Sequence, residues 1–209
     1  MARALRPVTR VWPVLPQGTS RGHPLRPARL LRRAGLRARM RVADVGCGTG
    51  AFTVPAAVIV GPVGRVYAVD ISEDLLRTLR ERVDAQGLRQ IATVAATPAA
   101  IPLPDVFVDL AILAFVLHEA ADPVALAREV ARILIPAGRV LLLEWEKRET
   151  PAGPPVRDRL TPEGSEVVLR DAGFITIDRF APGADRYGIL AVREPLVLGR
   201  PVPRDLDVV

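Results

Sequence analysis

Short apolar segments alternate with amphipathic segments along most of the chain. Apolar runs rich in Val, Ile, Leu and Ala predict strands over 41–45, 65–69, 91–95, 108–113 and 139–144. Around them, helical spacing and helix-start signals predict helices over 27–35, 51–60, 74–86, 124–134 and 162–172. Two later segments, 174–180 and 189–193, alternate as a closing hairpin. This order predicts an α/β fold in which a parallel sheet carries helices on both faces.

Three glycines at alternate positions follow the first predicted strand. Gly46, Gly48 and Gly50 end the run that begins at Val42, and Asp70 closes the next strand. Glycines permit a tight turn and let a ligand lie against bare backbone. An acid at the end of the second strand can accept hydrogen bonds from ribose hydroxyls. Together these features predict a site for an adenosine-containing cofactor.

Two cofactors fit this loop. As Gly46-x-Gly48-x-x-Ala51 it satisfies the dinucleotide fingerprint, whereas an acid two residues before the first glycine, Asp44, favours S-adenosylmethionine. A pyrophosphate binds helix N-terminal amides and disfavours a nearby carboxylate. S-adenosylmethionine instead carries a sulfonium and an ammonium, which a carboxylate suits. Cys47 lies inside the loop and is interpreted as a small packed residue rather than a nucleophile.

Six segments carry further motifs. They are 41–50 (RVADVGCGTG), 66–72 (VYAVDIS), 101–110 (IPLPDVFVDL), 115–123 (FVLHEAADP), 132–139 (RILIPAGR) and 171–174 (DAGF). In this order and spacing they resemble the motifs of the type-11 family of class I S-adenosylmethionine-dependent methyltransferases, the group that includes the ubiquinone/menaquinone C-methyltransferases. The resemblance extends from about residue 25 to about residue 195.

This resemblance implies a fold and a cofactor. The implied fold is the Rossmann-like class I methyltransferase fold, with a mostly parallel seven-stranded sheet, a C-terminal antiparallel hairpin and helices on both faces. The implied cofactor is S-adenosylmethionine, and the implied product is S-adenosylhomocysteine. The enzyme would move a methyl group to a small-molecule acceptor by in-line displacement.

One position departs from the family pattern. Where the family has Gly-Asp-Ala, whose Asp binds the adenine amino group, this chain has Ala96-Thr97-Pro98. Thr97 offers a hydroxyl but no charge, and Pro98 lacks a backbone N–H that could contact the adenine ring. The change predicts weaker cofactor binding, or an adenine held mainly by packing against Ile71. It also leaves open a non-catalytic S-adenosylmethionine-binding protein.

The candidate site lies where the strands end, because ligands of open α/β sheets bind beyond the carboxyl ends of the strands. The residues expected to contact the cofactor are Asp44, Gly46, Cys47, Gly48, Gly50, Asp70, Ile71, Thr97, Pro98, Ala114 and Phe115.

Three polar residues follow the fourth and fifth strands and are the candidate catalytic residues. His118, Glu119 and Glu144 could act as an acceptor-side base or as orienting groups. The alternative is that His118 and Glu119 only cap a helix or pair locally. The proline-rich segment 150–159 is the expected substrate-side loop. Asp109 begins its strand, away from the cofactor edge, and is interpreted as structural.

The charge is divided unevenly along the chain. Residues 1–43 hold eleven arginines and no acid, so the remainder has 18 basic and 23 acidic residues and a net charge of −5. The formal charge of +6 therefore belongs to the N-terminal part, where it could contact nucleic acid or an anionic surface, or reflect a coding bias toward arginine. We expect a basic, flexible arm over 1–24, a methyltransferase domain over 25–195 and a tail over 196–209.

Composition also limits the compartment and the binding partners that we expect. A single cysteine indicates a reducing compartment, and two histidines are too sparse for a metal site, so a cytoplasmic protein without a metal is expected. Few aromatic residues and an acidic domain disfavour nucleic acid as the substrate. The apolar run 106–117 is too short to span a membrane. A monomer or homodimer is expected.

A dehydrogenase is the less favoured alternative. An NAD(P)-binding oxidoreductase would share the glycine loop, but no Tyr-x-x-x-Lys pair occurs in the chain. The later motifs also fit methyltransferases better.

Overall fold

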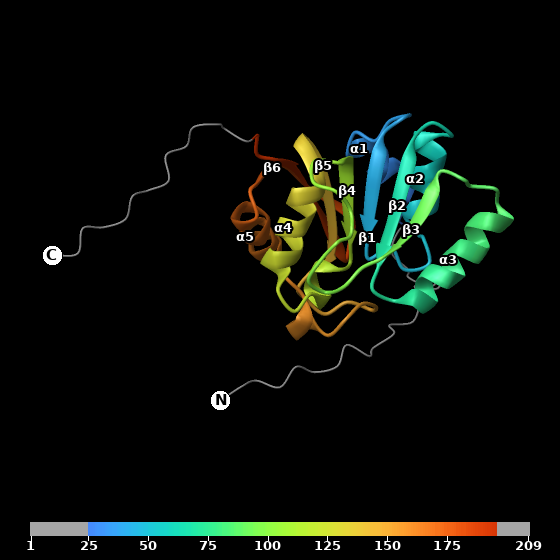
Figure 1. Ribbon diagram of the computed structural model, residues 1–209. Coiled ribbons are helices and arrows are strands. Elements are labelled where there is room, and N and C mark those ends of the chain that lie inside the picture. The colour runs from blue at the N-terminus through green and yellow to red at the C-terminus, as the bar shows by residue number, and fades with distance from the viewer. Residues whose placement is uncertain (1–24, 196–209) are drawn as a thin grey trace.

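The computed structural model describes residues 25–195, so the arm and the tail expected from the sequence lie outside the described residues. Its helices are α1 (Pro27–Arg33), α2 (Thr53–Val60), α3 (Glu73–Ala85), α4 (Pro123–Ile133) and α5 (Pro162–Asp171), with short 3-10 turns η1 (Leu117–Glu119) and η2 (Val156–Asp158). Its strands are β1 (Arg41–Val45), β2 (Arg65–Asp70), β3 (Ile91–Ala95), β4 (Val108–Ala114), β5 (Leu134–Trp145), β6 (Phe174–Gly183) and β7 (Arg186–Arg193) (Figure 1).

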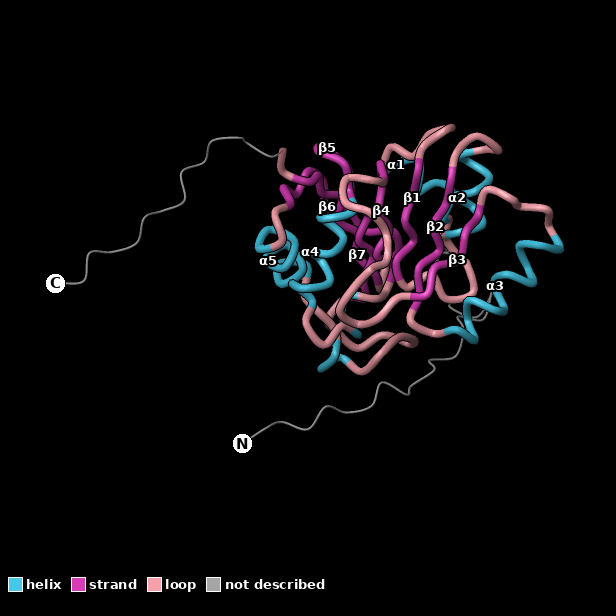
Figure 2. Tube along the Cα trace, viewed as in Figure 1, coloured by secondary structure: helices cyan, strands magenta, loops and turns pink. Residues whose placement is uncertain are grey.

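The strands form a single seven-stranded sheet in the order β3-β2-β1-β4-β5-β7-β6 (Figure 2). β1 to β5 pair in parallel, and β7 pairs antiparallel with both β5 and β6. The fold expected from the sequence is therefore confirmed. The chain leaves β1 toward β2 on one side and returns to β4 on the other, so β1 and β4 flank the switch point where ligands of open sheets bind.

Helices cover both faces of the sheet (Figure 1). One core contains apolar residues of α1, α2 and α3 and the strand positions that include Val42, Leu110 and Leu143. The other contains residues of α4 and α5 and the alternate positions that include Ala43, Leu113 and Leu142. Because neighbouring strand residues point to opposite faces, each buried strand supplies both cores.

Helix starts follow the local signals in the sequence. The Ser72 hydroxyl accepts from the Leu75 amide and caps α3. The Asp122 carboxylate accepts from the Ala125 amide at 2.9 Å and caps α4, whose first residue is a proline. Both side chains satisfy amides that have no partner within the helix.

The largest differences from the predicted boundaries are in the fifth strand and in the two closing strands. The fifth strand was expected from Arg139 but begins at Leu134, which pairs with Val108 before the register shifts. Ala137, with a φ of +59°, lies within that irregular stretch, so the segment 136–138 interrupts the pairing rather than preceding the strand. The closing strands are also longer than predicted, since pairing resumes at Gly183 and Arg186 after an irregularity that follows Phe180.

Candidate functional site

The glycine loop turns sharply at the end of β1. The amides of Gly46 and Cys47 both donate to the Val69 carbonyl, at 2.8 and 3.0 Å. Gly46 has a φ of +71°, and a Cβ atom there would overlap the Val116 side chain. Glycine is therefore required at this position by both conformation and space. The same contact joins the loop to the segment that follows β4.

Gly48 faces open space. Its φ is +53°, and a Cβ atom at this position would meet nothing within 4 Å. Its amide donates to an Asp70 carboxylate oxygen at 2.9 Å, and the other oxygen accepts from the Ser72 amide at 2.9 Å. Asp70 therefore ties the loop to the end of β2.

Two exposed segments lie next to Asp70. Ile71, directly after the buried end of β2, is 54% exposed, so its apolar side chain is open to solvent. The Ala96 amide donates to the Asp70 carbonyl at 2.9 Å, which brings the Thr97–Pro98 turn beside the end of β2. Thr97 and Pro98 are both exposed. The structure thus gathers the residues expected at the adenosine half of a cofactor.

Asp44 lies beneath the loop and is 2% exposed. One of its oxygens accepts from the Thr53 hydroxyl of α2 at 2.5 Å. Burial raises the pKa of the Asp44 carboxyl to about 6, the Thr53 hydrogen bond opposes the shift, and the charge of Asp70 adds to it. A carboxyl with this pKa changes its charge readily when a cation approaches.

Cys47 is buried inside the loop, and its sulfur lies 3.6 Å from the Gly48 carbonyl oxygen. Burial raises the pKa of the thiol, and the charges of Asp44 and Asp70 raise it further. A thiol that stays protonated is a poor nucleophile. The structure therefore supports a packing role for Cys47.

The part of the site that was expected to face a methyl acceptor begins where β4 ends, at the half-buried Ala114 and Phe115. Phe115 has a φ of +64°, and its amide donates to the Leu143 carbonyl at 2.8 Å. Its ring lies 5.4 Å from the ring of Trp145, centroid to centroid. A left-handed backbone is costly for a phenylalanine, and such positions concentrate at functional sites.

A buried histidine–glutamate pair lies behind this turn. Nδ1 of His118 is 2.8 Å from a Glu144 carboxylate oxygen, and the His118 amide donates to the other oxygen at 3.2 Å. The two side chains are 5% and 1% exposed. Burial acts to lower the pKa of His118, but the hydrogen bond and charge of Glu144, with the charge of Glu119, raise it above its ordinary value.

Glu119 lies on the outer side of this pair. Its carboxylate is 3.8 Å from Nε2 of His118, and its side chain is 44% exposed. Burial raises the pKa of Glu119, His118 acts to lower it, and the charges of Glu144 and Asp70 raise it further. Of the three candidate catalytic residues, Glu144 is thus enclosed by protein, whereas Glu119 reaches solvent.

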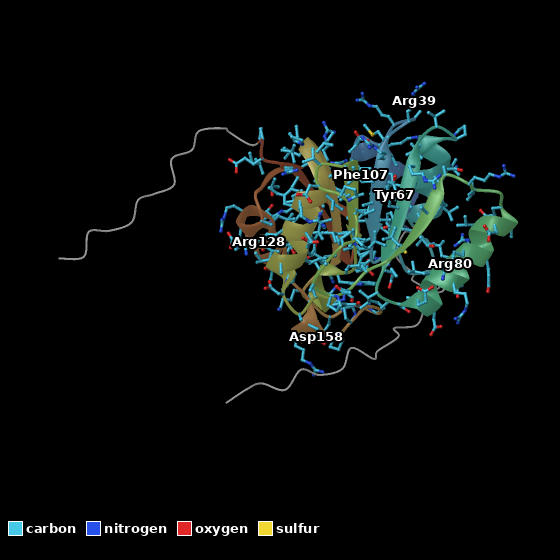
Figure 3. All side chains as sticks on the ribbon, in the orientation of Figure 1. Arg39, Tyr67, Arg80, Phe107, Arg128 and Asp158 are labelled. Carbon is cyan, nitrogen blue, oxygen red and sulfur yellow. The ribbon has the colours of Figure 1, made fainter. Side chains whose placement is uncertain are left out.

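The loop between β5 and α5 is folded around a buried arginine. The Arg159 guanidinium donates to the carbonyls of Pro154, Glu146, Arg148 and Ala152 and to the Thr150 hydroxyl, at 2.8 to 3.2 Å. This loop includes the proline-rich segment expected on the substrate side. Figure 3 places its Asp158 at the carboxyl edge of the sheet, opposite Arg39.

Sequence reasoning missed two arginines of this region. Arg159 is 3% exposed and Arg186 is 5% exposed, and both guanidinium groups lie near the Trp145 ring, at 5.7 and 4.8 Å from its centroid. No signal in the sequence distinguishes them from the many other arginines. Asp109, by contrast, lies at the opposite edge as predicted and accepts from the Arg41 amide at 2.7 Å.

Within residues 25–195, no group of His, Cys, Asp and Glu side chains is arranged to hold a metal ion. No helix of this part of the chain is both long enough and apolar enough to cross a membrane.

Comparisons with known proteins agree with this geometry. Residues 43–142 match a family described as a methyltransferase domain. A solved S-adenosylmethionine-dependent methyltransferase from Aquifex aeolicus is 30% identical, with a TM-score of 0.78 over 81% of this chain and 90% of that chain. The chain belongs to the type-11 family of class I S-adenosylmethionine-dependent methyltransferases.

Curated relatives of this methyltransferase family member are named for quinone biosynthesis. Demethylmenaquinone methyltransferase of Geobacillus stearothermophilus is 31% identical over 55% of this chain and 49% of its own length. The ubiquinone/menaquinone biosynthesis C-methyltransferase UbiE of Shewanella sp. (strain ANA-3) is 31% identical over 66% of this chain and 57% of its own length. The chain thus spans about half the length of these relatives.

Proposed function

We propose that this protein transfers a methyl group from S-adenosylmethionine to a small-molecule acceptor by in-line displacement, with S-adenosylhomocysteine as the product. When bound, the cofactor supplies a methyl group on a sulfonium sulfur, which would leave as the neutral thioether of S-adenosylhomocysteine. The chain then has to bind both molecules, orient the acceptor toward the methyl group and exclude water from the site. The observation that carries the proposal is the contact of Gly46 with Val116, which brings the glycine loop beside the segment that holds His118.

The ends of β1 and β2 fit the adenosine half of this cofactor. The free space at Gly48 allows a ligand to approach the backbone. Each Asp70 oxygen accepts one amide, which leaves lone pairs for ribose hydroxyls. The exposed Ile71 side chain offers an apolar surface for an adenine ring.

We propose that Asp44 attracts the cationic half of the cofactor. It contacts Thr53 and is enclosed by protein, so its charge acts through space rather than by direct contact. An opposite charge favours the ionised form of a carboxyl. A cation bound above the loop would therefore lower the pKa of Asp44, which burial raises to about 6, and would be attracted by the ionised carboxylate.

His118 is the proposed acceptor-side base. Its Nδ1 is held by Glu144, which leaves Nε2 to accept a proton from the acceptor. Glu144 is assigned as a positioning residue, because it orients the ring and stabilises a positive charge on it. The half-exposed Glu119 adds a second negative charge at 3.8 Å from Nε2.

The apolar surface next to this base suits an apolar acceptor. Phe115 is half-buried at the end of β4, and Ala114 precedes it. A quinone precursor, as named for the curated relatives, would fit such a surface. The acceptor we propose is therefore a small apolar-bodied molecule that loses a proton on methylation.

A second candidate, a non-catalytic S-adenosylmethionine-binding protein, is favoured by the Thr97–Pro98 turn. The Thr97 amide donates to the Ala100 carbonyl at 3.2 Å, and the Ala100 amide donates back to Thr97 at 3.3 Å. The Thr97 amide is therefore engaged, and Pro98 has none to offer. Few donors are left in this turn to recognise adenine.

Calorimetric titration with S-adenosylmethionine, S-adenosylhomocysteine, NAD and NADP tests the proposal. We expect binding of the first two only, and a loss of at least about thirtyfold in Asp70→Ala, because hydrogen bonds to a charged group contribute about 2 kcal/mol. The matched control is Asp109→Ala. Asp109 also accepts a backbone amide, but at the opposite edge of the sheet.

The control separates a binding role from a general loss of structure. Asp109→Ala should leave the affinity for both ligands unchanged. Tight NAD binding, or an equal loss in both variants, would contradict the assignment. Binding of S-adenosylmethionine without methyl transfer to any acceptor in a broad screen of quinols and phenols would favour the non-catalytic candidate.

A further inference from the structure

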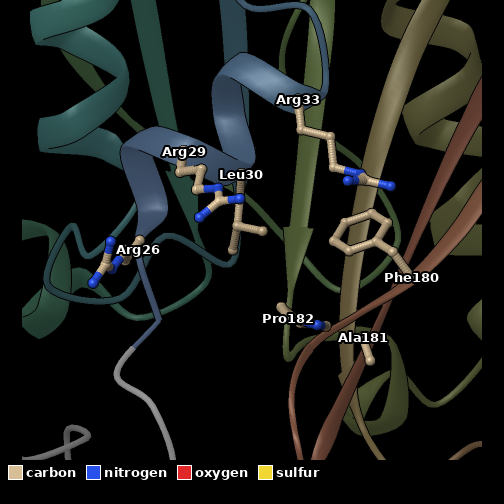
Figure 4. A pocket seen from close by; sticks show the side chains of 7 residues that line it. All are labelled: Arg26, Arg29, Leu30, Arg33, Phe180, Ala181 and Pro182. Atoms are coloured by element: carbon tan, nitrogen blue, oxygen red, sulfur yellow. The ribbon is translucent and has the colours of Figure 1, made fainter.

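A cavity of about 430 Å³ lies between α1 and the end of β6 (Figure 4). Its lining residues are Arg26, Arg29, Leu30, Arg33, Phe180, Ala181 and Pro182. Three of these carry a guanidinium group and none carries an acid. The remainder are apolar, so the cavity offers an apolar wall with positive charge along one side.

Only part of this charge is compensated. Arg33 pairs with Asp178 at 2.8 Å, and its guanidinium lies 4.4 Å from the Phe180 ring centroid. Arg26 and Arg29 form no ion pair with any other residue of 25–195, and Figure 4 shows both on the α1 side of the cavity. These arginines belong to the basic N-terminal part of the sequence, and the structure places them beside an apolar cavity.

A chain of neighbouring side chains links the cavity to the segment that follows β4. The Phe180 ring covers Gly188, since a Cβ atom there would lie 2.5 Å from the ring. Arg186 is two residues from Gly188 on β7 and therefore points to the same face of the sheet. Its guanidinium lies 4.8 Å from the ring centroid of Trp145, which in turn contacts Phe115.

Arg186 is a second cationic group on this face, and one of its donors is unsatisfied. Its side chain is 5% exposed, and its buried Nε has no hydrogen-bond partner among the described residues. The nearest carboxylate oxygen, on Asp185, is 3.6 Å away, beyond hydrogen-bond distance. A buried guanidinium is normally paired and hydrogen-bonded, because leaving it without acceptors is costly.

We propose that this face of the sheet binds an organic anion with an apolar body, and that this anion is the methyl acceptor. The apolar body packs on Leu30 and Phe180, and Arg26 and Arg29, which line the cavity, hold the carboxylate or similar group. Arg186, which lies outside the lining, adds positive charge on the same face of the sheet. The inference rests on the proposed function, to which it adds the charge of the substrate. Arginine suits this task because its guanidinium forms paired hydrogen bonds to planar anions.

The test compares two probes of equal shape and different charge. 1-Naphthoate and the neutral 1-naphthamide are titrated into the full chain saturated with S-adenosylhomocysteine, and binding is followed by calorimetry. We expect naphthoate to bind at least about tenfold more tightly, as hydrogen bonds to a charged group would provide. Equal affinity of the two probes, or no binding of naphthoate, overturns the proposal.

Variants then test which arginines cause the preference for the charged probe. The double change Arg26→Gln with Arg29→Gln, and the single change Arg186→Gln, should each reduce the preference for naphthoate at least about threefold. The matched control is Arg32→Gln, an exposed residue of the same helix that does not line the cavity. A preference that survives in both test variants, or is lost in the control, contradicts the assignment.

Binding of S-adenosylhomocysteine provides the separate readout. All variants should retain it, because none of these arginines lies at the glycine loop. Failure of the wild-type chain to bind it would refute the proposed function, whereas a preference for naphthoate would still establish the anion site.

Discussion

The two halves of the proposed site are built in different ways. The cofactor half, at the ends of β1 and β2, consists of backbone turned by glycines and two carboxylates within a short stretch of sequence. The acceptor half, at the ends of β4, β5 and β7, consists of buried charged side chains from distant segments. His118 and Glu144, for example, are 26 residues apart in the chain and in direct contact.

This difference indicates which half can accept amino-acid substitutions while the fold stays the same. The glycine loop is held by backbone geometry, so most substitutions there disturb the turn itself. The acceptor half is held by side chains that can be exchanged while the sheet remains, which is how one fold serves many substrates. The two halves meet where Gly46 contacts Val116.

The largest expected effect is at that meeting point. Gly46→Ala adds a Cβ that overlaps Val116 at a φ of +71°, so strain and overpacking combine. We expect a loss of about 3 kcal/mol in the free energy of unfolding, together with loss of S-adenosylhomocysteine binding. Urea denaturation and calorimetry would measure the two effects.

Two other glycines separate backbone strain from a role in binding. Gly48 and Gly87 both have positive φ and open space around a Cβ, but Gly87 lies at the end of α3, away from the loop. Gly48→Ala and Gly87→Ala should each cost about 1 kcal/mol of stability. Only Gly48→Ala should weaken cofactor binding, and normal binding by it would mean that the ligand does not approach this backbone.

An effect on stability between those of Gly46→Ala and Gly48→Ala concerns the acceptor half alone. Arg159→Met removes the guanidinium that holds the loop of residues 146–158, and leaves several carbonyls without a donor. We expect about 2 kcal/mol of destabilisation and faster amide hydrogen exchange within this loop. Binding of S-adenosylhomocysteine should stay within about twofold of wild type, because the loop does not form the glycine turn.

Arg157→Met is the matched control for this loop. Arg157 lies two residues away, its side chain is 78% exposed, and it should change neither stability nor exchange. If Arg159→Met abolished cofactor binding, the two halves would be coupled more strongly than their contacts indicate.

The same contrast explains what the sequence could predict. The glycine spacing, Asp70 and the helix caps act over a few residues, so the fold and the sharp turn of the glycine loop were predictable from local patterns. Arg159 and Arg186 gain their roles only when β5 and β7 pair and bury them beside Trp145. No local pattern marks which arginines will be buried in this way.

Element boundaries show the same limit. A Pro-Ala-Gly sequence normally indicates a turn, and the strand was expected to begin after it. The pairing of Leu134 with Val108 extends β5 across that turn, which is a tertiary effect. Residues that prove adjacent in space, such as Trp145 and Arg186, could not be paired before the order β5-β7-β6 was known.

The smallest expected effect concerns the cofactor half. It is a change in the free energy of unfolding whose size depends on pH. Asp44→Asn preserves an oxygen that can accept from Thr53 but removes the buried charge. Because burial raises the folded-state pKa of Asp44 from 3.8 to about 6, the wild-type native state loses stability as pH rises through this window. The variant lacks this loss and should be more stable than wild type above pH 6.

Urea denaturation at two pH values measures this effect. The advantage of Asp44→Asn should be about 1 kcal/mol greater at pH 8 than at pH 5, as a raised pKa of this size requires. Asp109→Asn, at the opposite edge of the sheet, is the control for the change in unfolding free energy that an Asp-to-Asn substitution causes elsewhere in the fold. If Asp44→Asn is stabilising yet binds S-adenosylmethionine more weakly, the buried charge is retained for the cofactor at the expense of stability. If its affinity is unchanged, Asp44 serves only to join β1 to α2, and the cation must be held by the acceptor half.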